Sequence, residues 1–100
     1  MPSSSEYLTY VLEQLDGAED IYFRKMMGEY IIYKAGRIIG GIYDDRFLVK
    51  PTPGVLEMMP EAELQEPYDG AKPMILVEDI DDKDFMKKLV DTVYSDLCNR

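Results

Sequence analysis

The sequence predicts an α+β fold, a two-layer α/β sandwich in which helices cover a mainly antiparallel sheet. Two observations predict it. Amphipathic helical patterns stand near both ends of the chain, and short β-rich runs separated by tight-turn residues fill the region between residues 21 and 50. The predicted order is α-β-β-β-β-α-β-α. One hundred residues with 46% hydrophobic content are expected to form a single domain, 1–100, with its own core.

Two long helices are predicted. The first begins at a capping box made by Ser3 and Glu6, and its apolar face consists of Leu8, Val11, Leu12 and Leu15. The second is capped by Asp81 or Asp82. Its last turn holds Cys98, which we expect to pack as a small apolar residue. Its apolar stripe consists of Phe85, Met86, Leu89, Val90, Val93, Tyr94 and Leu97.

Four strands are predicted between the helices, at residues 21–26, 29–34, 37–43 and 46–50. Gly36 supplies the positive φ of one hairpin turn, and Asp44 with Asp45 makes the next. A short helix follows, with Thr52 as its cap and Pro53 in its first turn. A fifth, buried strand is predicted at residues 74–78, after an acidic and turn-rich segment.

Gly40 and Gly41 stand in the middle of a predicted strand. A phosphate-binding loop would need a helix after the glycines and a following Lys-Ser/Thr, and neither is present. Glycines inside a strand typically mark a bulge or the close approach of another element. We therefore interpret them as the place where a helix or another backbone lies close to the sheet.

Composition argues against most catalytic chemistry. The chain has no histidine and one cysteine, so no histidine base, no disulfide framework and no cofactor or metal site are expected. The acidic segment 78–84 departs from the EF-hand pattern, because Lys83 and Asp84 stand where a ligand and a glycine are required, so we interpret its acids as helix caps. No signal peptide or membrane span is evident, and a cytoplasmic protein is expected.

The charge is uneven along the chain. The net charge is −9, yet residues 20–50 hold six Lys/Arg against four Asp/Glu. Overall acidity opposes non-specific nucleic-acid binding. The central block leaves a second hypothesis open, in which DNA is contacted directly by Arg24, Lys25, Lys34 and Arg37.

The run 30–33, Tyr-Ile-Ile-Tyr, is apolar on both faces of its predicted strand. Two long helices can cover only one face of the sheet, so part of the other is expected to be an exposed apolar patch. The alternative is that residues 53–59 fold over that side. A homodimer is expected to relieve such a patch. The candidate interaction surface consists of Arg24, Lys25, Tyr30, Ile32, Arg37, Met58 and Met59.

Residues 22–50, followed by 53–60, resemble the N-terminal domain of the TfoX/Sxy family of bacterial competence regulators. The residues that carry the resemblance are the Arg-Lys-Met-Met-Gly-Glu run at 24–29, the glycine-containing strand and the turn at 44–50. The resemblance implies an α/β domain that acts in transcriptional control together with the cyclic-AMP receptor protein. Full-length members carry a second, helical C-terminal domain, so a stand-alone N-terminal domain is expected here.

These observations favour a non-enzymatic regulatory or adaptor domain that binds a protein partner in transcription. Direct DNA binding is the second hypothesis. A small enzyme or ligand-binding domain that uses the acidic turns is the third.

Overall fold

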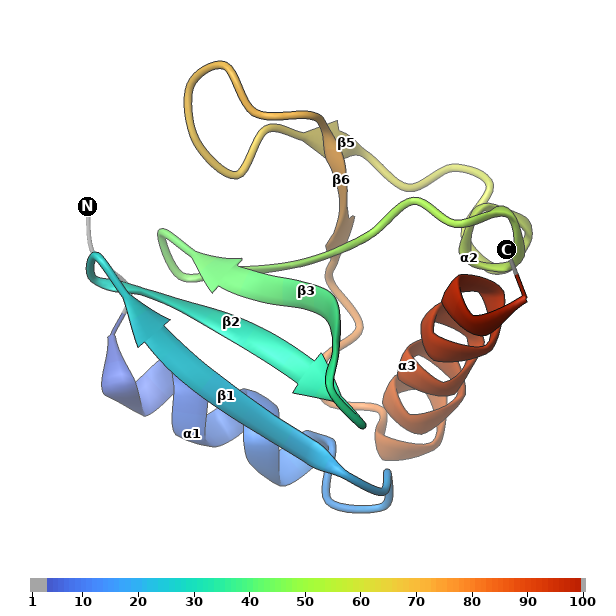
Figure 1. Cartoon of the computed structure of the whole chain (residues 1–100), viewed down its shortest axis with the longest axis horizontal. Coiled ribbons are helices and arrows are strands. Elements are labelled where there is room, and N and C mark those ends of the chain that lie inside the picture. The colour runs from blue at the N-terminus through green and yellow to red at the C-terminus, as the bar shows by residue number, and fades with distance from the viewer. Residues whose placement is uncertain (1–3, 100) are drawn as a thin grey trace.

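The computed structural model describes residues 4–99 and confirms the α+β class. The described strands form one antiparallel sheet in the order β1-β2-β3-β4-β6-β5. Figure 1 shows α1 along the β1–β2 hairpin and α3 beside the sheet, with α2 next to one end of α3. In chain order the elements are α1 (Ser5–Gln14), β1 (Ile21–Met26), β2 (Glu29–Lys34), β3 (Arg37–Tyr43), β4 (Arg46–Val49), α2 (Pro53–Met58), β5 (Leu64–Gln65), β6 (Met74–Val77) and α3 (Lys83–Cys98).

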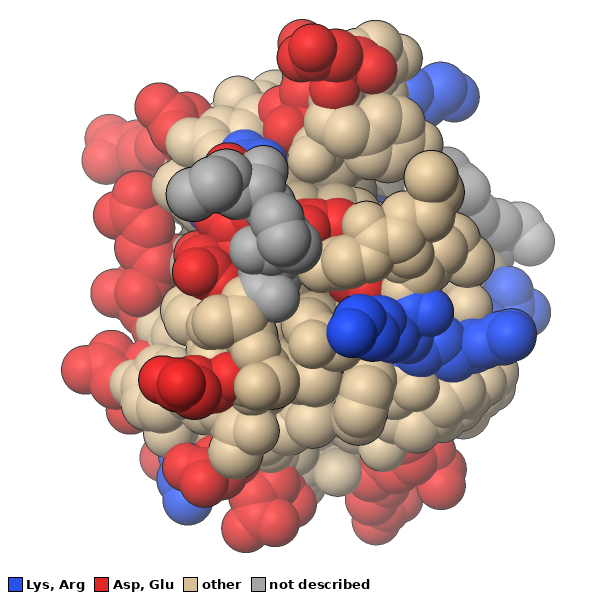
Figure 2. Space-filling view, turned by 90° about the vertical axis from the view of Figure 1, so that its left-hand side faces the viewer, with Lys and Arg blue, Asp and Glu red and all other residues tan. Residues whose placement is uncertain are grey.

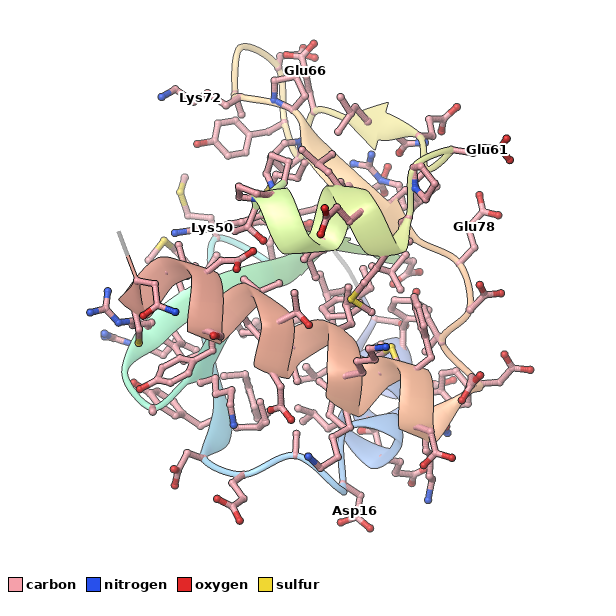
Figure 3. The ribbon with its side chains drawn as sticks, turned by 90° about the vertical axis from the view of Figure 1, so that its right-hand side faces the viewer. Asp16, Lys50, Glu61, Glu66, Lys72 and Glu78 are labelled. Carbon is pink, nitrogen blue, oxygen red and sulfur yellow. The ribbon has the colours of Figure 1, made fainter. Side chains whose placement is uncertain are left out.

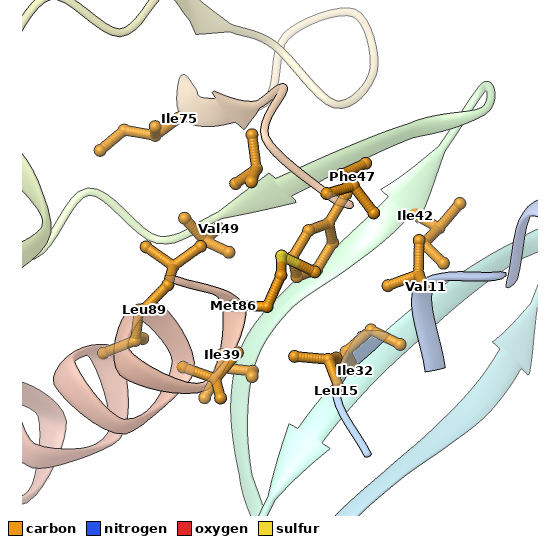
Figure 4. Close-up of a cluster of buried hydrophobic side chains, with 14 of the residues drawn as sticks. Val11, Leu15, Ile32, Ile39, Ile42, Phe47, Val49, Ile75, Met86 and Leu89 are labelled. Atoms are coloured by element: carbon orange, nitrogen blue, oxygen red, sulfur yellow. The ribbon is translucent and has the colours of Figure 1, made fainter. Parts of the chain in front are cut away.

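One face of the sheet carries the core (Figure 4). Directly opposite residues on paired strands project to the same side. The register pairs Tyr30 with Ile42, and Ile42 with Phe47. Val77 on β6 continues this row. The row joins a buried cluster to which the helices contribute Leu8, Val11, Leu15, Met86, Leu89, Val90 and Val93.

The starts of the two long helices, α1 and α3, are fixed by side-chain caps. The hydroxyl of Ser4 accepts the N–H of Tyr7 at 3.1 Å, while Ser3 of the predicted capping box lies outside the described residues. A carboxylate oxygen of Asp45 accepts the N–H of Ser4 at 2.8 Å, which ties α1 to the β3–β4 turn. Asp82 caps α3 as predicted, because it accepts the N–H of Phe85 at 3.1 Å.

Two local expectations were wrong. The acidic, turn-rich segment contains the two-residue strand β5, which pairs with the edge of β6. Two residues are too short to show a period of their own. Cys98 is exposed at the end of α3 and is not a packed apolar residue, although its side chain interacts with that of Tyr94.

The two glycines of β3 allow close approach, as the sequence predicts. A Cβ on Gly40 would lie 2.2 Å from the carbonyl oxygen of Leu48 on the neighbouring strand β4. A Cβ on Gly41 would lie 2.7 Å from a ring carbon of Tyr43. The register of β2 and β3 also shifts beside these glycines, between Ile32 and Tyr33. The approaching elements are therefore the backbone of β4 at Gly40, and the carbonyl oxygen of Tyr30 on β2 with the ring of Tyr43 at Gly41.

Thr52 precedes α2, but its side chain makes no capping hydrogen bond. The residue is 6% exposed, and its Oγ1 has no hydrogen-bond partner among the described residues. An unpaired buried hydroxyl is costly, and valine has nearly the same shape. We therefore expect Thr52→Val to raise the free energy of unfolding by about 1 kcal/mol, measured by urea titration.

Thr9→Val is the control, because the hydroxyl of Thr9 is exposed and bonded to the carbonyl of Ser5 at 2.9 Å. The free energy of unfolding of that variant is not expected to rise. A loss of stability in Thr52→Val would contradict the assignment of this hydroxyl as unpaired.

Candidate interaction surface

The open face is the side of the sheet opposite the buried cluster, and over β1, β2 and the start of β3 it carries Tyr22, Arg24, Ile31, Tyr33 and Ile38. The rings of Tyr22 and Tyr33 stack with centroids 4.8 Å apart and planes 3° from parallel. Ile38 lies directly opposite Tyr33. Tyr22 is 46% exposed and Ile38 is 41% exposed. Large apolar side chains therefore remain in water here, as the two-sided pattern of the strand predicts.

The same face is covered farther along the sheet. Gly41 lies opposite Leu48, which is fully buried although it does not belong to the core cluster. The ring of Tyr43 covers Gly41. Burial raises the pKa of Tyr43 above its ordinary value, and the nearby Tyr68 adds a smaller effect in the same direction. The open face is thus closed over the end of β3 and over β4, and exposed over β1, β2 and the start of β3.

The two candidate surface residues on β2, Tyr30 and Ile32, lie on the helix side of the sheet and not on its open face. Tyr30 is 6% exposed and Ile32 is fully buried, because both point into the cluster under the helices. The side chains that β2 places on the open face are those of Ile31 and Tyr33, which are half-buried. The alternation alone could not show which face the helices cover.

The methionine pair does not cover the open face. Met58 and Met59 are half-buried and pack against the core cluster on the helix side. Figure 3 shows α2 lying against α3 on that side. The alternative in which residues 53–59 fold over the open face is therefore wrong, and neither methionine is a freely exposed anchor.

The basic residues of the second hypothesis are not gathered. Arg24 and Lys25 are exposed on β1, whereas Arg37 is exposed at the β2–β3 turn. Lys25 pairs with Tyr30 and Arg37 with Lys34, so about 13 Å of strand separates the two positions. Figure 2 shows a small group of Lys and Arg on a face otherwise rich in Asp and Glu. In Figure 3, Asp16, Glu61 and Glu78 lie at the periphery of the helix side.

Lys34 is 8% exposed and is not available to a phosphate. Its Nζ donates to the carbonyl oxygen of Glu19 at 2.7 Å and lies 3.4 Å from a carboxylate oxygen of Asp91. Lys87 binds the other carboxylate oxygen of Asp91 at 2.8 Å. Burial by itself would raise the pKa of Asp91, but the hydrogen bonds from Lys87 and Lys34 outweigh it and hold the pKa below its usual 3.8. The cluster fastens α3 to β2.

A carboxylate with a depressed pKa stabilises the fold above its unfolded-state pKa and loses this effect as the pH falls through the folded value. Asp91→Asn should therefore cost about 0.5–1 kcal/mol above pH 5, because it weakens the charged hydrogen bonds of a carboxylate that is 39% exposed and partly screened by solvent. Below about pH 3.8, the difference between the variant and the wild type should shrink. Urea titrations between about pH 3 and 7 measure this difference in the free energy of unfolding.

Asp69→Asn, in an exposed loop, is the control, and its difference from the wild type should not change with pH. A difference that is independent of pH would contradict the role given to the Asp91 carboxylate.

Two familiar kinds of feature are absent from the part of the chain that the structure describes. Among residues 4–99, no three His, Cys, Asp or Glu side chains are grouped as a metal site would require. Within the same range, no helix has the length and apolar character needed to cross a membrane.

A protein of Spirochaeta aurantia is similar to this chain. The two are 30% identical over 80 residues, which cover 80% of this chain and 70% of that protein, described as an uncharacterized 12.7 kDa protein in the trpE 5′ region. This chain belongs to the family of that protein. No protein-family model matches the chain, and no solved structure matches it. Membership of the TfoX/Sxy family stays a prediction.

Proposed function

We propose that this chain is a non-enzymatic regulatory or adaptor domain of the bacterial cytoplasm, which binds a protein partner through the open face in the control of transcription. The observation that carries the proposal is the apolar surface of the open face, where Tyr22 and Ile38 are exposed and Tyr33 is half-buried. The role in transcription rests on the resemblance of residues 24–50 to competence regulators. By the same resemblance, the cyclic-AMP receptor protein is the first partner to test.

The chemistry of the open face supports a protein partner. The rings of Tyr22 and Tyr33 stack on each other across β1 and β2, and aromatic residues are enriched where proteins bind one another. Fully burying a side chain of this size stabilises a complex by roughly 1.5–3 kcal/mol. Arg24 stands on the same face and lies opposite Ile31. The surface suits a partner that presents apolar side chains next to an acidic group.

The structure gives direct DNA binding less support. The four cations of that hypothesis are divided between two ends of the sheet, and Lys34 is buried. Many phosphate contacts from one continuous basic surface would be needed to overcome a net charge of −9. The dispersed cations do not provide one.

The proposal is tested by capture on the immobilised domain, with purified cyclic-AMP receptor protein and, separately, with a lysate of the source cell. Wild type is expected to retain a protein that Tyr22→Thr/Ile38→Thr loses, since threonine keeps the strand while removing the apolar surface. Tyr10→Gln, at a 40% exposed position on α1, should retain it. Equal capture by all three proteins would overturn the role of the open face.

A parallel titration with random duplex DNA tests the second hypothesis. Weak binding with little dependence on salt is expected of the wild type. Sub-micromolar binding at physiological salt that is lost in Arg24→Glu or Arg37→Glu would overturn the protein-partner proposal.

A further inference from the structure

The two edges of the sheet differ in how well they are protected. The edge strand β5 has two residues, whereas the opposite edge strand β1 has six, without proline, glycine or a bulge in its pairing with β2. Five of the six β1 residues are exposed. A long, regular edge strand is a template for pairing with another strand.

The backbone groups that β1 presents can be assigned from the register. The N–H of Ala35 donates to the carbonyl of Asp20 at 3.0 Å, which makes these residues a hydrogen-bonded pair. Hydrogen-bonded pairs alternate along an antiparallel ladder, so the next are those of Tyr22, Arg24 and Met26 with β2. The N–H and C=O groups of Ile21, Phe23 and Lys25 therefore point away from β2, out of the sheet.

These outward groups are symmetric about Phe23. We propose that two copies of this chain pair antiparallel along β1, with Phe23 opposite Phe23 of the second copy, and so join their sheets into one. Ile21 then lies opposite Lys25 of the second copy, and each of the three outward residues exchanges both of its backbone hydrogen bonds.

The side chains agree with this register. Tyr22 falls opposite Arg24 of the second copy on the open face, where a guanidinium can lie over a tyrosine ring. No cation falls directly opposite another cation. Phe23, 42% exposed in one copy, meets its counterpart on the helix side of the sheet.

The charges of the strand are also self-complementary. The exposed acids Glu19 and Asp20 precede β1, and the exposed cations Arg24 and Lys25 stand near its other end. Antiparallel pairing brings the acidic end of each copy to the basic end of the other. At physiological salt the Debye length is about 8 Å, so the repulsion between two chains of charge −9 is largely screened while adjacent charges still attract. This complementarity selects a second copy over an unrelated strand.

The pairing does not depend on the proposed function. If both hold, the two open faces become neighbours and form one wider aromatic surface. A dimer that captures no partner would support the pairing and overturn the proposed function. A monomer that captures a partner would overturn the pairing and leave the proposed function standing.

Sedimentation equilibrium of the full chain over a broad concentration range tests the pairing. Wild type is expected to approach twice 11.5 kDa. Phe23→Pro removes an outward N–H but no bond to β2, so it should remain folded by circular dichroism and sediment as a monomer. Phe23→Val keeps the N–H and should still dimerise. A wild-type monomer at every concentration, or a folded Phe23→Pro dimer, would overturn the proposal.

A charge exchange provides a second test that does not depend on the proline variant. Arg24→Glu/Lys25→Glu makes both ends of the strand acidic, and Glu19→Lys/Asp20→Asn makes its acidic end basic. Asparagine suits position 20, where φ is 59°. Each variant alone should dimerise at least tenfold more weakly than wild type, and an equimolar mixture should restore the dimer. No recovery in the mixture would overturn the antiparallel register.

Discussion

Gly40→Ala is expected to be the most destabilising single substitution discussed for this chain, with a loss of more than about 3 kcal/mol. The added Cβ would lie 2.2 Å from the carbonyl oxygen of Leu48 and 2.9 Å from the Cα of Val49. Both are backbone atoms of β4, so no side-chain rotation can relieve the clash. Domains of this size are stable by about 5–15 kcal/mol, so the loss should be a large fraction of the free energy of unfolding. Urea titration followed by circular dichroism measures the loss.

Gly17→Ala is the matched control. A Cβ there would meet only the Cδ of Lys87, at 3.7 Å, which is an ordinary contact. Its effect should stay within about 0.5 kcal/mol. Equal stability of the two variants would mean that β3 and β4 do not approach as closely as the structure has them.

Leu89→Ala is expected to cost roughly 2–4 kcal/mol. Leu89 is fully buried in the cluster that joins α3 to the sheet, so truncation removes apolar contacts and leaves a cavity. The midpoint of urea unfolding should fall while the slope stays unchanged, because the surface exposed on unfolding is nearly the same.

Leu56→Ala is the control for this truncation. Leu56 lies on α2 and is 44% exposed, so less apolar surface is lost and the cost should be below about 1 kcal/mol. Similar losses at both positions would contradict the packing of α3 against the sheet.

The functional proposals concern different surfaces of the same sheet. The open face offers exposed apolar side chains for a protein partner, and the edge of β1 offers backbone groups for a second copy. Tyr22 and Arg24 belong to both, since they stand on the edge strand and project to the open face. A dimer formed along β1 would thus change the surface that a partner meets.

The amino-acid sequence by itself determined the elements of this fold. Helical spacing of apolar residues defined α3. Its cap, Asp82, is one of the two residues, Asp81 and Asp82, that the sequence offers. Gly36, with φ of 86°, and the pair Asp44–Asp45 defined hairpin turns. These features are local, because each depends on the period of a side-chain pattern or on the φ angles a residue tolerates. The sequence also showed that β2 is apolar on both sides.

The tertiary structure decided what these elements do together. Both faces of β2 are apolar, and only the packing of α1 and α3 shows that Tyr30 and Ile32 lie inside while Ile31 and Tyr33 face outward. The contact of α2 with α3 also joins distant parts of the chain, and it keeps Met58 and Met59 off the open face. Lys34 looks like a surface cation in the sequence, but its burial depends on Asp91, which lies 57 positions farther along the chain. Such pairings depend on how distant segments meet in space, so periodicity and local propensity could not supply them.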